Sequence, residues 1–211
     1  MTSSATAPRP TAKERKTQAR AARARAESAV AARRARHRRI AWVVGLLVVV
    51  AVVALGLASS RQTSSEGTRL APDFTLPTTS GGTVSLSDLR GSPVVLYFNE
   101  GAGCASCTVQ MVEIEKEPGF AEAGITVLPV VMSTAEQMLA DMQRYGATTP
   151  YLLDDGTVSE AYGTLGTGMH EGLPGHGFVL IDGEGNQLWQ GEYPSMWLEP
   201  GQLLHEVTSR L

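Results

Sequence analysis

Hydrophobic and polar positions divide the chain into two different parts. Residues 40–58 form an uninterrupted apolar run of 19 residues without a charge, whereas residues 70–211 contain short apolar runs separated by polar turns. A helix of 19 residues is just long enough to cross the hydrocarbon core of a bilayer. The first pattern therefore predicts one transmembrane helix, and the second predicts a single globular domain.

Within the second part, runs of β-forming residues alternate with segments of helical periodicity. Two short strands are expected around a Gly-Gly turn, and the wholly apolar run 93–99 is typical of a strand covered on both faces. Apolar positions three and four apart predict a helix over 105–118. The later elements are expected as a strand over 125–132, a capped helix over 133–146, a short strand over 151–154, a helical turn over 157–163, a hairpin over 177–193 and a helix over 200–211. This order predicts an α/β domain with a mixed sheet and helices on both faces.

Charge is distributed unevenly along the chain. Residues 1–58 hold 12 Lys and Arg against two Glu, whereas residues 59–211 hold 6 Lys and Arg against 19 Asp and Glu. Because the arginine-rich run ends directly before the apolar segment, the positive-inside rule predicts a cytoplasmic amino terminus and an extracytoplasmic domain. The alternative is a signal peptide cleaved after Ala58, which the long basic leader disfavours.

The predicted organisation has four segments. Residues 1–39 have too few apolar side chains for a packed core and are expected to form a basic disordered cytoplasmic tail. The transmembrane helix follows over 40–58, and the polar residues 59–69 are expected to be a flexible linker. The globular domain spans 70–211, which makes the protein a single-pass protein of the cell membrane.

The only two cysteines, Cys104 and Cys107, form a C-x-x-C motif where a strand meets a helix. A disulfide between them closes a loop of four residues, so chain entropy would contribute only about 2 kcal/mol of stability. Redox chemistry needs an attacking thiolate and a second thiol nearby, and this motif supplies both. The unpaired N–H groups of a helix amino terminus stabilise a thiolate at Cys104, and Cys107, one turn later, is the expected resolving thiol.

Metal binding is an alternative interpretation of the same cysteines. Cys104, Cys107, His170 and His176 form C-x2-C followed by H-x5-H, an imperfect match to zinc spacings, and thiolates also suit copper(I). Only the fold could bring the two pairs together, because a long segment separates them. Redox chemistry is favoured, and we expect no cofactor and no resident metal.

Several stretches resemble the redoxin branch of the thioredoxin-like superfamily, which groups alkyl hydroperoxide reductase/thiol-specific antioxidant proteins with membrane-tethered thiol-disulfide oxidoreductases. The resemblance rests on "APDFTL", the turn before the strand at 93–99, the cysteine motif and "FVLIDGEG", in this order. It spans roughly Leu70 to the carboxyl terminus. It implies a thioredoxin-like sheet with flanking helices and an oxidoreductase activity.

The two sub-branches imply different chemistry for the same pair. Thioredoxin-like oxidoreductases carry C-x-x-C at a strand-to-helix turn, which implies that Cys104 attacks a substrate disulfide and Cys107 resolves it. Peroxiredoxins carry P-x-x-x-T-x-x-C, so the alternative is an atypical peroxiredoxin in which Cys107 attacks peroxide and Cys104 resolves. Glu100 and Cys104 then replace the Pro and the Thr of that motif, and Gly175 replaces an expected Arg. The first activity fits better.

Three further residues are candidates for lining the site. Glu100 lies close to the cysteines in sequence, and His176 could lie beside the sulfurs as a proton shuttle, because histidine titrates near physiological pH. Pro174 is one position from the place of the cis-proline in thioredoxin-like proteins, and the sequence leaves its cis or trans state open. The expected partners are a protein or small-molecule thiol or disulfide, or a peroxide, with an external electron donor and no nucleic acid.

Overall fold

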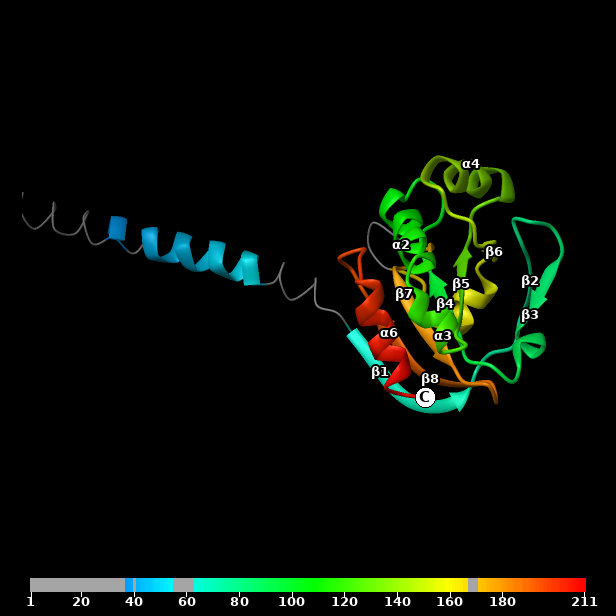
Figure 1. The fold of residues 1–211 in the computed structure, drawn as a ribbon. Helices are drawn as coiled ribbons and strands as arrows, with labels where there is room; N and C mark the ends of the chain where they lie inside the picture. Colours follow the sequence, from blue (N-terminus) through cyan, green and yellow to red (C-terminus); the bar gives the residue numbers. More distant parts are fainter. Residues whose placement is uncertain (1–36, 40, 55–62, 167–170) are drawn as a thin grey trace, which may run out of the picture. The chain divides into compact units, whose positions relative to one another are not determined.

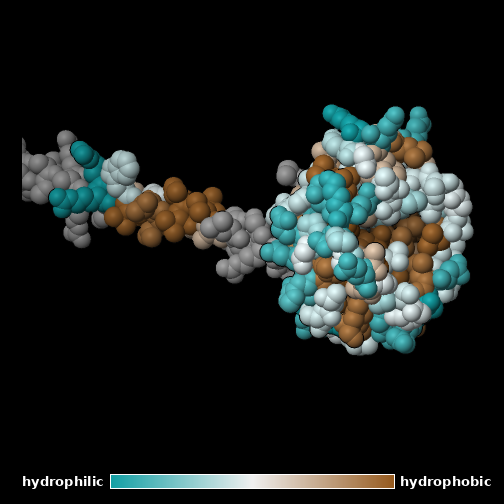
Figure 2. Space-filling model, in the orientation of Figure 1, coloured by the Kyte–Doolittle hydropathy of each residue, from teal (hydrophilic) through white to brown (hydrophobic). Residues whose placement is uncertain are grey.

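A computed structural model describes residues 37–39, 41–54, 63–166 and 171–211, and the chain divides into two units between Ser59 and Ser60. The first unit contains the helix His37–Ala54, which is long and apolar enough to cross a membrane, a test that a signal sequence also passes. Its hydrophobic side chains are exposed (Figure 2). The predicted membrane span stays a prediction, and its first residue and last four residues lie outside the described part, as does the tail up to residue 36.

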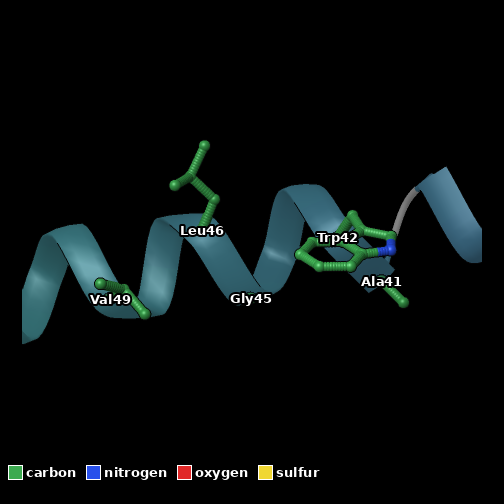
Figure 3. Close-up of a pocket in the computed structure, with 5 residues that line it drawn as sticks. All are labelled: Ala41, Trp42, Gly45, Leu46 and Val49. Carbon is green, nitrogen blue, oxygen red and sulfur yellow. The ribbon is translucent and has the colours of Figure 1, made fainter.

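One face of this helix carries a shallow hollow (Figure 3). A single helix supplies all the lining residues, which are Ala41, Trp42, Gly45, Leu46 and Val49. Trp42 is 79% exposed, so the hollow is open apolar surface and not an enclosed binding site.

The second unit is built on a mixed sheet (Figure 1). Its strands are β1 (Thr63–Leu70), β2 (Thr75–Pro77), β3 (Thr83–Ser85), β4 (Val94–Phe98), β5 (Thr126–Val131), β6 (Leu152–Leu153), β7 (Gly177–Ile181) and β8 (Asn186–Glu192). The main sheet has the order β1-β8-β7-β4-β5-β6, and β2 and β3 form a separate hairpin. Strands β4, β5 and β6 are parallel, whereas β7 and β8 run antiparallel to their neighbours. The predicted mixed sheet is therefore confirmed.

The helical elements also follow the predicted order. They are η1 (Leu86–Leu89), α2 (Ala105–Glu115), α3 (Pro118–Glu122), α4 (Ala135–Tyr145), α5 (Thr157–Ala161) and α6 (Pro200–Thr208). The capped helix is confirmed, because Thr134 and Gln137 form a reciprocal capping box and Gly146 ends α4 with a φ of 84°. The single helix expected over 105–118 is wrong at its end. Pro118 has no N–H to continue α2, and it begins the separate helix α3 instead.

Alternate residues of β4 face two different cores. Val95 and Tyr97 pack in a core with residues of α2, α3, α4 and α6, whereas Val94, Leu96 and Phe98 pack with the β2–β3 hairpin, η1 and α5. All five residues of β4 are buried, so the apolar run of this strand is explained by cover on both faces. The helices lie on both faces of the sheet, as predicted.

The linker prediction is wrong over residues 63–69. These residues belong to β1, which pairs antiparallel with β8 and adds an edge strand to the sheet. Glu66 on this strand also forms an ion pair of 2.8 Å with Arg210. The side chains of residues 64–70 are exposed, so β1 has no apolar alternation that would reveal it in the sequence.

Candidate active site

Both cysteines lie at the junction of β4 and α2. Cys104 is the N-cap residue of α2, Cys107 lies in its first turn, and a disulfide joins them with their Cα atoms 5.3 Å apart. The Cys107 N–H donates to Cys104 Sγ at 3.3 Å, and the first turn of α2 contains no acidic residue. A thiolate on Cys104 would therefore be stabilised by this N–H and by the positive end of the helix dipole.

The two cysteines differ in accessibility. Cys104 is partly exposed, whereas Cys107 is 1% exposed and packs beneath it. The Ser106 hydroxyl lies on the outer side, 3.4 Å from Cys104 Sγ. An external substrate can therefore reach the Cys104 sulfur in this arrangement, and Cys107 is open only to groups of the protein itself.

The loop that leads into Cys104 is fixed by hydrogen bonds from its own backbone. The N–H groups of residues 101–103 donate to the side chains of Asn99, Ser133 and Asp141, at 3.0, 2.9 and 2.7 Å respectively. Gly101 has a φ of 79°, and a Cβ at this position would collide with the Ser133 hydroxyl. Side chains after β4, before α4 and within α4 thus set the path of the chain into the cysteine motif.

His176 contacts Cys107 from the sheet side of the site. Its Nδ1 lies 3.9 Å from Cys107 Sγ and 3.1 Å from the Tyr97 hydroxyl, which donates to the Cys107 carbonyl at 3.2 Å. Burial lowers the pKa of His176 to about 4 and raises the pKa of Tyr97 well above its ordinary value, with smaller contributions from Tyr151 and Glu100. Both side chains are therefore neutral at pH 7 in the disulfide form.

The other two candidate residues, Pro174 and Glu100, lie on segments that lead to this cluster. Pro174 is buried two residues before His176, pairs with Leu165, and has a trans peptide bond. Glu100 lies in the loop between β4 and the cysteines, and its charge acts on the Tyr97 hydroxyl. His176 is thus in direct contact with Cys107, whereas Pro174 is linked to the cluster through the chain and Glu100 through its charge on Tyr97.

The metal interpretation rested partly on His170, which lies outside the described residues. Among the residues that are described, no group of three or more His, Cys, Asp or Glu side chains could hold a metal ion.

The sequence does not predict two side chains that contribute to the site, Tyr97 and Asp141. Tyr97 carries the only polar side-chain group in β4, and this hydroxyl in an otherwise apolar strand is the one feature of the sequence that could indicate its role. Asp141 looks like an ordinary polar residue of an amphipathic helix, and nothing in the sequence indicates that it binds the Gly103 N–H. Both contacts depend on tertiary structure.

Acidification is expected to destabilise the oxidised protein through His176. Its pKa is about 4 when folded and near 6.5 when unfolded, so the unfolded chain takes up the proton first as the pH falls. Stability should decrease from about pH 6.5 to about pH 4 by roughly 3 kcal/mol from this group and then level off. Urea unfolding at pH values of about 7.5 and about 4.5 should show a smaller loss in His176→Gln than in the wild type. His205→Gln, exposed on α6, is the control, and equal losses in all three proteins would contradict the prediction.

Comparison with known proteins identifies a family and several similar proteins. A family model described as "AhpC/TSA family" matches residues 68–186, a range that includes both cysteines and His176. The chain is 33% identical over 121 residues to a Mycobacterium tuberculosis protein provisionally named a peroxiredoxin, which covers 54% of this chain and 77% of that protein. It is 30% identical over 136 residues to the thiol-disulfide oxidoreductase ResA of Bacillus subtilis. This match covers 60% of this chain and 74% of ResA.

The fold has a counterpart among solved structures. The crystal structure of the peroxidoxin BcpB from Mycobacterium tuberculosis superposes with a TM-score of 0.59 and 21% identity, over 68% of this chain and 97% of that one. At this identity the likeness establishes a shared thioredoxin-like fold.

Proposed function

Since the chain belongs to the AhpC/TSA family and is similar to proteins that are named as oxidoreductases, we propose that it exchanges thiols and disulfides through Cys104 and Cys107. The difference in exposure between the two sulfurs carries this proposal. Cys104 is partly exposed at a helix amino terminus, whereas Cys107 is 1% exposed and within disulfide distance of it. This arrangement suits an attacking thiolate with a protected resolving thiol.

The reaction proceeds in two displacements. The Cys104 thiolate attacks one sulfur of a substrate disulfide, forms a mixed disulfide and releases the first substrate thiolate. Cys107 then attacks Cys104 Sγ, breaks the mixed disulfide and releases the second thiolate, so two electrons pass to the substrate and the pair becomes oxidised. An external thiol donor returns the pair to the dithiol, and the reduction potentials decide in which direction the exchange runs.

Peroxide reduction is the second candidate, because the names of several relatives favour it. In this reaction the Cys107 sulfur would attack the peroxide oxygen, form a sulfenic acid and release an alcohol or water. The Cys104 thiol would then condense with the sulfenic acid to form the disulfide and release one water. The burial of Cys107 counts against this reaction. So does the presence of Glu100, Cys104 and Gly175 where peroxiredoxins are expected to have Pro, Thr and Arg.

We further propose that the helix His37–Ala54 tethers the domain to the outer face of a membrane. The support is the length and apolar character of this helix and the basic residues before it. A membrane-impermeant maleimide should then label reduced Cys104 in intact cells, and labelling only after lysis would reject this topology.

The two chemical candidates differ in which oxidant they accept. The reduced full-length protein should form the Cys104–Cys107 disulfide rapidly with glutathione disulfide and slowly with hydrogen peroxide, as followed by mass spectrometry. Dimedone, which traps sulfenic acids, should leave Cys107 unmodified in Cys104→Ser. Rapid dimedone labelling of Cys107 in that variant would reject the proposed exchange in favour of peroxide reduction.

A further inference from the structure

In the second displacement Cys107 must lose its proton, and neither cysteine provides a group that accepts it. Cys107 is 1% exposed, and burial in apolar surroundings disfavours a thiolate. The N–H and dipole of α2 act on Cys104, which is the N-cap residue. A resolving attack by Cys107 therefore needs a nearby group that accepts its proton.

We infer that His176 accepts the proton of the Cys107 thiol when Cys107 attacks the mixed disulfide on Cys104. This inference rests on the proposed thiol-disulfide exchange and adds a catalytic base to it. The carrying observation is the distance of 3.9 Å between His176 Nδ1 and Cys107 Sγ, both of which are buried. The imidazole of His176 is in direct contact with the reacting sulfur of Cys107, and this contact lies in the protein interior.

Tyr97 is placed to stabilise the protonated histidine without adding a charge. Its hydroxyl donates to the Cys107 carbonyl at 3.2 Å, so its oxygen is free to accept a hydrogen bond. That oxygen lies 3.1 Å from His176 Nδ1 and 3.4 Å from Nε2. Once Nδ1 carries the proton of Cys107, its N–H donates to Tyr97, and a chain of hydrogen bonds runs from the imidazolium to the Cys107 carbonyl.

Among the described residues, few other titratable groups lie around His176. Tyr97 faces it from β4, Cys107 from α2 and Tyr193 from the segment after β8, where the Tyr193 N–H donates to the His176 carbonyl. Glu100 is placed to act on Tyr97. Glu192 lies across the sheet beside Gly177, on the face opposite to His176, and burial raises its pKa. Cys107 is therefore the natural proton donor to His176.

The proton and electron balance of the step is complete. The S–H bond of Cys107 breaks and an N–H bond forms at His176 Nδ1, while the Cys107 sulfur forms a bond to Cys104 Sγ. The bond between Cys104 and the substrate sulfur breaks, and that sulfur leaves with the electron pair. The imidazolium then returns its proton to the leaving thiolate or to solvent. The disulfide form ends with a neutral His176, as burial requires.

The test uses reduced full-length protein and the chromogenic disulfide DTNB, which releases one coloured thiolate in each displacement. The first phase reports attack by Cys104, and the second phase, which does not depend on reagent concentration, reports attack by Cys107. His176→Gln should slow the second phase about 100-fold at neutral pH and leave the first phase unchanged. Its second phase should also rise with pH over a wider range than that of the wild type. His205→Gln, exposed on α6, should leave both phases unchanged.

The possible results distinguish failure of the role inferred for His176 from failure of the proposed exchange reaction. A second phase that His176→Gln does not slow, or equal slowing of both phases, would overturn the role of His176 alone. Absence of both phases in the wild type would reject the exchange reaction itself. Should His176→Gln fail to fold, NMR titration of the wild type decides the role: the pKa of His176 should be higher in the dithiol form than in the disulfide form, and equal values would overturn the inference.

Discussion

Replacing Cys104 with serine is expected to reduce the rate of disulfide exchange by about 10³-fold or more, because the substrate then meets no accessible thiolate. The Cys107 sulfur that remains is 1% exposed. Replacing Cys107 with serine should have a different result, since Cys104 can still attack and the reaction should stop at a mixed disulfide. Mass spectrometry after addition of glutathione disulfide should therefore show the unmodified chain for Cys104→Ser and a glutathione adduct on Cys104 for Cys107→Ser.

Ser106→Ala is the matched control for these variants. The Ser106 hydroxyl lies 3.4 Å from Cys104 Sγ and can change the rate of its attack, but it forms no bond to substrate, so the variant should still form the disulfide without a lasting glutathione adduct. An adduct on Cys107 in the Cys104→Ser protein would reverse the assigned roles of the two cysteines. It would show that the buried sulfur opens to substrate in solution.

The fold could be predicted wherever local sequence and tertiary structure agree. The apolar run of β4 is buried on both faces, and the capping residues of α4 bind as their spacing predicts. The edge strand β1 could not be predicted in this way, because its polar side chains are exposed and it pairs with β8, more than a hundred residues later. An edge strand of this kind is held by backbone hydrogen bonds, which leave no pattern in the sequence.

The same contrast applies to the candidate site. The spacing of Cys104 and Cys107 at the start of a helix is a local signal, and it led to the redox prediction. The contact of His176 with Cys107 joins residues 69 positions apart and could only be suggested through a family resemblance. The contribution of Tyr97 required the packing of α2 against β4, which brings its hydroxyl to the Cys107 carbonyl. Chemistry that depends on several elements thus appears only in the folded chain.

Replacing Phe178 with alanine is expected to lower the free energy of unfolding by about 3–5 kcal/mol, through lost burial and the cavity that remains. Phe178 is fully buried in β7, and its ring stacks on Tyr97 with the ring centroids 4.7 Å apart. It also meets the rings of His176 and Tyr193 edge-on, each at 5.8 Å. Denaturant unfolding of the oxidised protein measures the loss, and a change below about 1 kcal/mol would show that the core closes around the smaller side chain.

The consequences of Phe178→Ala should extend beyond stability, because Phe178 supports both residues that contact Cys107. Without its ring, Tyr97 and His176 lose their fixed positions, and the second phase of the DTNB reaction should slow while the first phase is retained. Val179→Ala is the control: Val179 is equally buried, but it faces the opposite core with the β2–β3 hairpin and α5. This variant should lose stability with both phases intact. Equal slowing of the second phase in the two variants would mean that general loosening of β7, and not the placement of Tyr97 and His176, limits the attack by Cys107.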